Sequence, residues 1–342
     1  MRNISRSRRF PVWGPDMTRL GDVIKVLGIA AILGLSAQGA VAKDALDIQV
    51  QSKGKPHDFL FGVSFEGGNG VAVGDHGLLL STSDGGASWS RLDSPVSQSA
   101  LLSIVRSNGR CLAGGQQGAI LRSDDCIKWE SVKAVTDARI LGIHANSKGE
   151  AYAVGGFGTV LRSLDWGRSW QSVAVDWKGL LGTDAEPHLY AVQVAEDGAV
   201  TLAGEFELVL RSAVAGGRWE VLHKGERSLF GLFVGQKGGI FAVGQEGLIL
   251  RSSDAGKTWA EVNSGTKSVL TDVWASNNGA SVIAVGVRTV LLSRDGGAIF
   301  VADKSQMAHS QIHSSVAGIE GQKDGLVVVI GGASGSILRA KF

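Results

Sequence analysis

Residues 237–259 read KGGIFAVGQEGLILRSSDAGKTW, and this stretch decides the fold. Its first half is a short apolar run, 240–243, that ends at Gly244, and a tight turn over 245–247 leads into a second apolar run at 248–250. Two short β-prone runs joined by a glycine-bounded turn predict a hairpin. The stretch ends in a second turn, Ser-x-Asp-x-Gly-x-Thr-Trp, which leads into a further strand.

The same pattern recurs along most of the chain. Further copies occupy residues 70–89, 110–129, 151–170, 200–219, 282–300 and 327–342. The first six copies in chain order close with an aromatic residue: Trp89, Trp129, Trp170, Trp219, Trp259 and Phe300. The spacings between these residues are 40, 41, 49, 40 and 41. A period near 40 with several short strands in each unit predicts a radial or solenoid repeat architecture.

Each unit contains four strand signals, because an apolar run precedes each hairpin and a further strand begins near the closing aromatic residue. Four antiparallel strands repeated around a centre form the blade of a β-propeller. Blades bury both faces against their neighbours, which explains why the apolar runs are nearly continuous. We therefore predict an all-β fold, a seven-bladed β-propeller of four-stranded antiparallel blades, as a single domain over residues 43–342.

The two ends of the propeller sequence predict how the ring closes. The seventh copy ends after its third strand, whereas residues 46–52 form an additional alternating strand ahead of the first complete blade. We expect this N-terminal strand to pair with residues 337–341 and to complete the last blade. Such pairing leaves no free sheet edge.

The first residues have the pattern of an export signal. Residues 26–37 form a predominantly apolar run of 12, preceded by Arg19 and Lys25 and followed by Ala-Val-Ala at 40–42. This arrangement predicts a signal peptide over residues 1–42 that is cleaved on export, and therefore a periplasmic protein. The run is too short to span a bilayer. The signal contains six basic and two acidic residues, so the formal charge of +2 becomes about −2 for the mature protein, which disfavours nucleic-acid binding.

The chain contains two cysteines, Cys111 and Cys126. Cys111 opens the first strand of its hairpin and Cys126 lies in the turn after the second, and antiparallel pairing brings these places together. Export favours oxidation, so we predict a disulfide, with two buried free thiols as the alternative. A metal site is not expected, because no second cysteine pair or suitably spaced histidine accompanies them.

A second turn follows the hairpin in most repeats and has the pattern Ser/Thr-x-Asp-x-Gly-x-Ser/Thr-Trp, known as the Asp box. Its aspartate can accept backbone N–H groups, its glycine provides positive φ, and its tryptophan packs on the blade. We predict a structural role for these residues: Asp84, Trp89, Asp125, Trp129, Asp165, Trp170, Asp254, Trp259, Asp295 and Phe300. The second copy lacks one residue and has Cys126 in the turn, and the fourth has Val214 in place of the aspartate.

With these AVG-x-x-G, L-R-S and Asp-box units over residues 57–342, the sequence resembles the seven-bladed Asp-box (BNR) propellers of the photosystem II stability and assembly factor type. The resemblance implies a non-enzymatic scaffold or assembly factor, without a cofactor, that binds a membrane-protein complex on its periplasmic or lumenal side. This chain lacks the lipoprotein cysteine of cyanobacterial members. Some bacterial propellers of this kind resemble companions of RND-type exporters, which implies an inner-membrane partner of that class.

Five of the seven repeats carry an arginine in the L-R-S motif: Arg122, Arg162, Arg211, Arg251 and Arg339. The repeat geometry places these arginines in a partial ring at one radius. Two interpretations remain open. Each arginine pairs between adjacent blades, or together they form a basic band that binds an acidic segment of a partner.

The interval of 49 residues marks an insertion at 176–187, between the third and fourth repeats. It places Trp177, Leu180 and Leu181 in a connection on the face where ligands usually approach. We predict these three residues as partner contacts, with the alternative that the loop folds back onto the ring.

The alternative functions are an Asp-box glycoside hydrolase and a glycan-binding propeller. A sialidase needs a tyrosine nucleophile, but Tyr152 and Tyr190 occupy apolar repeat positions that explain them by packing. No acidic pair stands out from the turn residues, so we predict that the chain is not an enzyme. A glycan-binding module predicts exposed aromatic residues on one face, for which Trp166 and Trp177 are the candidates.

Two histidines are close enough in the sequence to be considered as ligands of one metal ion. His309 and His313 are four residues apart in a segment that we expect to be a strand. A strand separates them by about 13 Å, which one metal ion does not bridge. We therefore predict no metal site.

Overall fold

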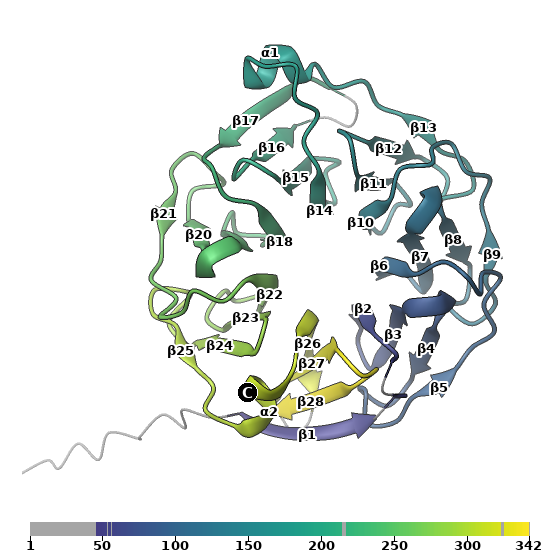
Figure 1. Cartoon of the computed structure of the whole chain (residues 1–342), viewed down its shortest axis with the longest axis vertical. Coiled ribbons are helices and arrows are strands. Elements are labelled where there is room, and N and C mark those ends of the chain that lie inside the picture. Colours follow the sequence, from purple (N-terminus) through teal and green to yellow (C-terminus); the bar gives the residue numbers. More distant parts are fainter. Residues whose placement is uncertain (1–45, 53, 56, 214–216, 323–324, 342) are drawn as a thin grey trace, which may run out of the picture. The chain divides into compact units, whose positions relative to one another are not determined.

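The computed structural model of the chain describes residues 46–52, 54–55, 57–213, 217–322 and 325–341. Within these residues, the strands form seven four-stranded antiparallel sheets, arranged radially around a central channel (Figure 1). The prediction of a seven-bladed propeller is confirmed. The predicted signal peptide lies outside the described residues.

Blades 1 to 6 each consist of four strands that are consecutive in the chain. The strands of blades 1 and 2 are β2 (Leu60–Glu66), β3 (Asn69–Gly74), β4 (Leu79–Thr82), β5 (Ser90–Arg91), β6 (Leu101–Ser107), β7 (Arg110–Gly115), β8 (Ile120–Ser123) and β9 (Glu130–Ser131). The strands of blades 3 and 4 are β10 (Ile140–Ala145), β11 (Ala151–Gly155), β12 (Val160–Ser163), β13 (Gln171–Ser172), β14 (Leu189–Val194), β15 (Val200–Gly204), β16 (Val209–Ser212) and β17 (Trp219–His223). The strands of blades 5 and 6 are β18 (Leu229–Val234), β19 (Ile240–Gly244), β20 (Ile249–Ser252), β21 (Ala260–Glu261), β22 (Leu270–Ala275), β23 (Val282–Gly286), β24 (Thr289–Ser293) and β25 (Val301–Ala302).

Blade 7 closes the ring with strands from both ends of the propeller. Its order is β1-β28-β27-β26, and the bounds are β1 (Asp47–Ser52), β26 (His313–Gln322), β27 (Gly325–Gly332) and β28 (Ile337–Lys341). In Figure 1, β1 lies at the outer rim beside β28. Asp47 pairs with Lys341 and Val50 pairs with Leu338. The predicted closure by an N-terminal strand is confirmed.

A buried carboxylate holds the start of that closing strand. Asp303, in the connection between blades 6 and 7, is fully buried. Its Oδ2 accepts the backbone N–H of Leu46 at 2.5 Å, and its Oδ1 accepts the N–H of Ser305 at 2.8 Å. Since buried N–H groups need partners, this contact fixes where the N-terminal strand begins.

The two faces of the ring carry different loops, because the strands of a blade alternate in direction. We call the upper face the one that carries the turn between the second and third strands of each blade and the connection to the next blade. The lower face carries the hairpin between the first two strands and the Ser/Thr-x-Asp turn. Hydrogen bonds join the two kinds of loop on each face. On the upper face, the N–H of Asp75 donates to the carbonyl of Phe59. On the lower face, the N–H of Gly85 donates to the carbonyl of Gly68.

Neighbouring blades are joined along the channel by side chains of their innermost strands. Ser103 Oγ accepts the N–H of Ile143 at 3.0 Å, and Ser315 Oγ accepts the N–H of Val63 at 3.2 Å. Farther out, apolar side chains fill the space between facing sheets. Between blades 3 and 4, for example, Tyr152 is fully buried in one such cluster. Side-chain bonds and apolar burial thus position each blade against the next.

The two cysteines form a disulfide, as predicted. Cys111 in β7 is bonded to Cys126, and their Cα atoms are 5.2 Å apart. Cys126 lies in the turn after β8 with a positive φ of 59°. The bond ties the shortened turn of blade 2 to the strand beside it.

Short helices occupy a few connections: α1 (Trp177–Leu181), α2 (Gln306–Ser310), η1 (Asp75–Gly77), η2 (Gln116–Gly118) and η3 (Gln245–Gly247). The strand expected across His309 and His313 is wrong, because His309 lies in α2, whose N-cap Ser305 accepts the N–H of Ala308, and only His313 begins β26. No helix among the described residues has the length and apolar character needed to cross a membrane.

Candidate functional site

The L-R-S arginines lie on the third strand of each blade and reach toward the next blade. Arg211 Nη1 donates to the carbonyl of Ala255 at 2.8 Å, and Arg339 Nε donates to the carbonyl of Gly85 at 2.9 Å. Arg122 Nε donates to the carbonyl of Trp166 at 3.5 Å. All three acceptors follow the aspartate of a Ser/Thr-x-Asp turn in the next blade. These three arginines therefore join adjacent blades, which was one of the two interpretations of the ring.

The remaining two arginines of the set differ from each other. Arg162 pairs within its own blade, with Nη2 at 3.1 Å from Glu150 Oε1. Arg251 lies beside Gly296 of blade 6, since a Cβ at that glycine would be 3.9 Å from Arg251 Nη2. Partner binding by the five arginines stays a prediction.

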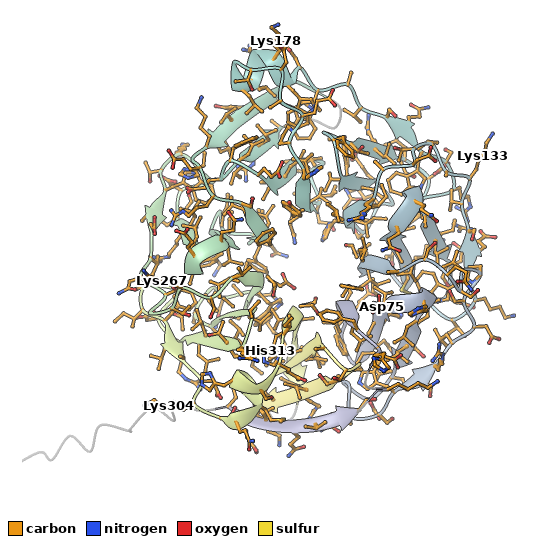
Figure 2. The ribbon with its side chains drawn as sticks, in the orientation of Figure 1. Asp75, Lys133, Lys178, Lys267, Lys304 and His313 are labelled. Atoms are coloured by element: carbon orange, nitrogen blue, oxygen red, sulfur yellow. A yellow bond between two sulfur atoms is a disulfide. The ribbon has the colours of Figure 1, made fainter. Side chains whose placement is uncertain are left out.

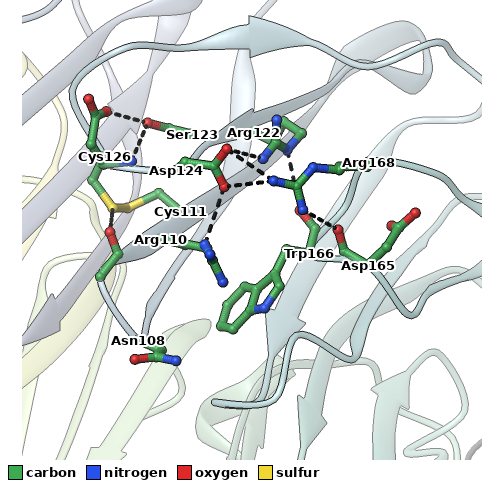
Figure 3. A network of polar contacts seen from close by, with 12 residues as sticks. Asn108, Arg110, Cys111, Arg122, Ser123, Asp124, Cys126, Asp165, Trp166 and Arg168 are labelled. Carbon is green, nitrogen blue, oxygen red and sulfur yellow. Dashed lines mark hydrogen bonds and ion pairs between the residues drawn. A yellow bond between two sulfur atoms is a disulfide. The ribbon is translucent and has the colours of Figure 1, made fainter.

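Blades 2 and 3 carry a larger ionic network on the lower face (Figure 3). The Asp124 carboxylate binds Arg122 at 2.7 Å (Nη2 to Oδ2), Arg110 at 3.2 Å (Nε to Oδ1) and Arg168 at 3.2 Å (Nη2 to Oδ2). The hydrogen bond from Arg122 and the field of the three arginines lower the pKa of Asp124 below its usual range. Glu130 also pairs with Arg122, so three guanidinium groups face two carboxylates here.

An aromatic ring borders this network. The guanidinium of Arg110 lies 4.8 Å from the centre of the Trp166 ring, a cation–π contact. Trp166 is half-buried and adopts a positive φ of 61°. Its indole packs over Gly149, where a Cβ would lie 2.3 Å from Nε1. Trp166 therefore packs against the blade and leaves only part of its surface for a glycan.

The Ser/Thr-x-Asp turns hold their aspartates by several donors. Asp84 Oδ1 accepts the Thr82 hydroxyl at 2.7 Å and the N–H of Ser88 at 3.0 Å. Burial raises the pKa of Asp84, but the hydrogen bonds from Ser88 and Thr82 outweigh it and lower the pKa to about 2. The Trp89 indole donates to the carbonyl of Gly86 at 3.1 Å.

The hydrogen bond from the tryptophan indole to the turn glycine recurs in two other blades, and it is absent from the described turns whose sequence differs. Trp170 and Trp259 donate to Gly167 and Gly256 at 3.1 Å. In the shorter turn of blade 2, the Trp129 indole N–H is buried without a hydrogen-bond partner among the described residues. In blade 6, Asp295 accepts the hydroxyl of Ser293 at 2.7 Å, and Phe300 is buried.

The insertion between blades 3 and 4 folds back onto the ring. It forms α1 at the outer edge near β17 (Figure 1). Trp177 is buried, and its indole covers Gly158, where a Cβ would lie 2.4 Å from Nε1. Leu180 and Leu181 pack against the apolar cluster between the blades. Figure 2 shows Lys178 of this helix at the periphery of the ring, where Lys133, Lys267 and Lys304 also lie. Partner contact by Trp177, Leu180 and Leu181 stays a prediction, and burial of Trp177 leaves little of it to contact.

The upper face carries a set of residues that the sequence interpretation missed. In each blade, one non-glycine residue at the tip of the turn between the second and third strands adopts a left-handed conformation, with φ between 52° and 61°. These turn-tip residues are His76, Gln117, Phe157, Phe206, Glu246, Arg288 and Ser334. Phe157 is 72% exposed and Phe206 is 42% exposed. The variable positions within AVG-x-x-G contained this signal, because only blades 3 and 4 have an apolar residue there.

The central channel has a volume of about 820 Å³ and is lined by the first strands of all seven blades. Near its upper mouth, the lining residues include aromatic and aliphatic ones: Phe59, Phe61, Leu102, Leu141, Tyr190, Phe230 and Ile312. Phe61 stacks on Phe59 with ring centres 4.7 Å apart, and Tyr190 meets Phe230 edge-on at 4.8 Å. The mouth is therefore an aromatic recess. Tyr190 is partly buried in this wall and also lines the channel.

Two titratable groups lie deeper in the channel wall. Burial raises the pKa of Asp272 to about 6, although Val316, Val273 and Ser315 donate hydrogen bonds to it. Burial lowers the pKa of His144 to about 4, and its Nδ1 accepts the N–H of Val194 at 3.1 Å. Both groups join adjacent blades, since each bonds to the innermost strand of the next blade.

Comparison with known proteins shows the fold. No protein-family model matches the chain, and no curated protein matches its sequence. Among solved structures, YCF48 bound to D1 peptide has a TM-score of 0.68 at 18% identity, over 87% of this chain and 99% of that one. YCF48 from Cyanidioschyzon merolae has a TM-score of 0.67 at 18% identity, over 86% and 98%. The WD40 β-propeller domain of Doa1 has a TM-score of 0.65 at 13% identity, over 86% and 97%.

These similarities extend over nearly the whole propeller. At such low sequence identity, these similarities show a shared propeller architecture only. They do not assign a role to any side chain of this chain. Among the described residues, no group of three or more histidine, cysteine, aspartate or glutamate side chains is arranged to hold a metal ion.

Proposed function

We propose that this chain is an exported, non-enzymatic propeller scaffold or assembly factor that binds a membrane-protein complex on its periplasmic side. The observation that carries the proposal is the similarity, over 87% of the chain, to a propeller solved with a bound peptide. Export is supported by the apolar run at 26–37 and by the disulfide between Cys111 and Cys126, a bond typical of oxidising compartments.

The polar groups of the ring support a binding role. Several carboxylates of the lower face are held in structural contacts: Asp84 and Asp165 accept turn hydrogen bonds, and Asp124 is held by three arginines. Tyr152 is fully buried between blades, where it has no access to a substrate. A rigid ring of this kind presents loops and a channel mouth to a partner.

The proposal is tested by purifying the tagged, exported protein from detergent-solubilised membranes and from the soluble periplasm. We expect one membrane-protein complex to be recovered with it from the membrane fraction, and an exported propeller of unrelated sequence to serve as the control. An RND-type exporter is one candidate partner, and deleting that exporter then removes the recovered complex. Recovery of no membrane protein above the control, or turnover of aryl glycosides by the purified protein, would contradict the proposal.

A further inference from the structure

The two exposed phenylalanines lie in strained positions. The upper turn of blade 3 is closed by a hydrogen bond from the Thr159 N–H to the Gly156 carbonyl, and Phe157 is the first of its two central residues. Left-handed φ values at both central residues define a type I′ turn, which favours Asn, Asp or Gly. A non-glycine residue in this conformation is strained, because its Cβ lies too close to the following carbonyl oxygen. Exposure of a phenylalanine at 72% adds no compensating burial.

The corresponding turn of blade 4 departs further from the repeat. Five of the other six blades have glycine at the second central position, and blade 6 has a shorter turn without it. Blade 4 has Glu207 there, with φ of 48° after Phe206 at 61°. Glu207 is buried. Its carboxylate binds Arg227 Nε at 2.7 Å and His223 Nε2 at 3.1 Å, and Arg227 in turn binds Glu261 of blade 5 at 2.7 Å. An ionic network therefore holds the turn that exposes Phe206.

One histidine connects the two phenylalanine turns. His188 Nδ1 accepts the N–H of Phe157 at 3.0 Å, and the two rings meet edge-on with centres 5.0 Å apart. The N–H of His188 donates to Glu205 Oε2 at 2.8 Å, and its carbonyl accepts the N–H of Glu205. Because Glu205 precedes Phe206, the exposed rings belong to one connected surface over blades 3 and 4.

This surface continues into the channel mouth, where it includes the positively charged side chain of Arg139. The carbonyl of Arg139 accepts the N–H of Gly156, next to Phe157. The exposed Arg139 lines the channel together with Leu141 and Tyr190. Within the described part of the chain, no hydrogen bond or ion pair of its guanidinium is found. An unpaired arginine beside an aromatic recess is suited to bind a carboxylate.

We propose that Phe157, Phe206, Arg139 and the adjoining channel mouth form a docking site for an extended segment of the partner polypeptide that carries apolar side chains and a carboxylate. The inference rests on the proposed function and names the part of the protein that performs it. The two rings stand on separate blades beside a recess, so a narrow extended chain fits them better than a flat surface. Arg139 selects for a negative charge in that chain.

The left-handed conformation is common to all seven turn-tip residues, so blades 3 and 4 are distinguished by the exposed phenylalanine side chains that they place there. Exposed aromatic residues that are held rigidly lose little entropy on binding and are frequent energetic centres of interfaces. Here His188 holds one turn and the Glu207 network holds the other.

The test is site-specific photo-crosslinking in the exported full-length protein. Phe157, Phe206, Leu164 and Ile299 are replaced one at a time by p-benzoylphenylalanine. Leu164 and Ile299 are matched controls, because they are 66% and 65% exposed and lie in lower-face turns. We expect positions 157 and 206 to crosslink to the same segment of one membrane protein, and mass spectrometry to find apolar residues and a carboxylate in that segment.

A synthetic peptide of the crosslinked segment then gives the energetics. We expect the double variant Phe157→Ser and Phe206→Ser to bind it about 30-fold more weakly. We expect Arg139→Ala to bind about tenfold more weakly, and only when the peptide retains its carboxylate. Leu164→Ser and Ile299→Ser should bind as the wild type does, and thermal unfolding of each variant confirms that it is folded.

The outcomes separate this inference from the proposed function. Crosslinks to a membrane protein from positions 164 or 299 alone overturn the docking site but leave the proposed function standing. No membrane protein at any of the four positions overturns both. If Phe157→Ser with Phe206→Ser abolishes sedimentation of the protein with vesicles of phosphatidylethanolamine and phosphatidylglycerol, the rings bind a lipid surface and the peptide site is overturned.

Discussion

Arg339, near the end of the last blade, donates a hydrogen bond to the carbonyl of Gly85 in the first blade, with 2.9 Å between Nε and O. Arg211 makes the corresponding contact with Ala255 in the next blade. At these two positions, the recurring arginine of the repeat therefore joins adjacent blades. Because an arginine donates in several directions, a second role for its remaining N–H groups is compatible with this contact.

Removal of this contact should weaken the ring. We expect Arg339→Ala and Arg211→Ala each to lower the free energy of unfolding by about 1–2 kcal/mol, because a charge-assisted hydrogen bond is lost and a carbonyl is left unpaired. Denaturant unfolding measures the effect, with the peripheral Lys133→Ala as control. Unchanged stability in both variants, together with loss of the partner, would assign these arginines to binding alone.

The start of the closing strand offers a second test. We expect Asp303→Ala to lower the free energy of unfolding by about 2–4 kcal/mol, since the buried N–H of Leu46 and the partly buried N–H of Ser305 lose their acceptor. Asp58→Ala is the control, because its carboxylate accepts an exposed N–H, that of Lys55. Equal stabilities of the two variants would show that Asp303 does not hold the N-terminal strand.

The disulfide is a third source of stability. Cys111 and Cys126 are 15 residues apart, and a loop of that size stabilises by about 3 kcal/mol in the loop-entropy model. We expect the double variant Cys111→Ser and Cys126→Ser to unfold at a lower temperature, and a reducing agent to have the same effect on the wild type only. A melting temperature that neither treatment changes would argue against this contribution.

The repeat period predicted most of the fold, because each copy contains the same short strands and turns and the two chain ends supply complementary strands. The disulfide was also predictable, because the register of a hairpin places Cys111 beside the turn that contains Cys126. The segment around His309 was not, because a single N-cap, Ser305, starts a helix that repeat periodicity does not contain.

The candidate site was less predictable, for a physical reason. Repeat spacing gives the radius of an arginine, but whether its guanidinium meets solvent or the next blade depends on the turn that faces it. The insertion showed the same limit, since Trp177 covers Gly158 of another loop. The turn tips were visible as variable positions, but their exposure and left-handed φ emerge only when the ring is assembled.

The pH dependence of stability provides a fourth test, and its sign follows from two pKa values. Asp272 has a folded pKa of about 6 against 3.8, so its contribution is present below pH 3.8 and is lost as the pH rises through 6. His144 has a folded pKa of about 4 against 6.5, so its contribution is present above pH 6.5 and is lost as the pH falls through 4. The lowered pKa of buried His313 acts in the same direction as His144.

The two channel groups therefore oppose each other between pH 4 and 6.5. Relative to the wild type, we expect Asp272→Asn to make the free energy of unfolding rise more with pH across this window, by about 3 kcal/mol, and His144→Gln to make it rise less by a similar amount. The aspartates of the Ser/Thr-x-Asp turns affect stability only at lower pH, since the pKa of Asp84, for example, is lowered to about 2. Denaturant unfolding at a series of pH values measures the slopes. Parallel curves for both variants and the wild type would contradict the assignment.

The upper turn of blade 3 stores backbone strain at Phe157. Phe157 has a φ of 54°, and its ring is 72% exposed, so the position favours glycine for backbone reasons while the side chain adds little burial. We expect Phe157→Gly to leave the free energy of unfolding unchanged or to raise it by about 0.5–1 kcal/mol, although a large aromatic side chain is removed. Phe157→Val should lower it by more than about 1 kcal/mol, because a β-branched residue is poorly tolerated at positive φ. Thermal and denaturant unfolding of the two variants measure the difference. A loss of stability in Phe157→Gly as large as that in Phe157→Val would mean that the ring itself supports the fold, through His188 for example, and that the strain is offset within the propeller without a partner.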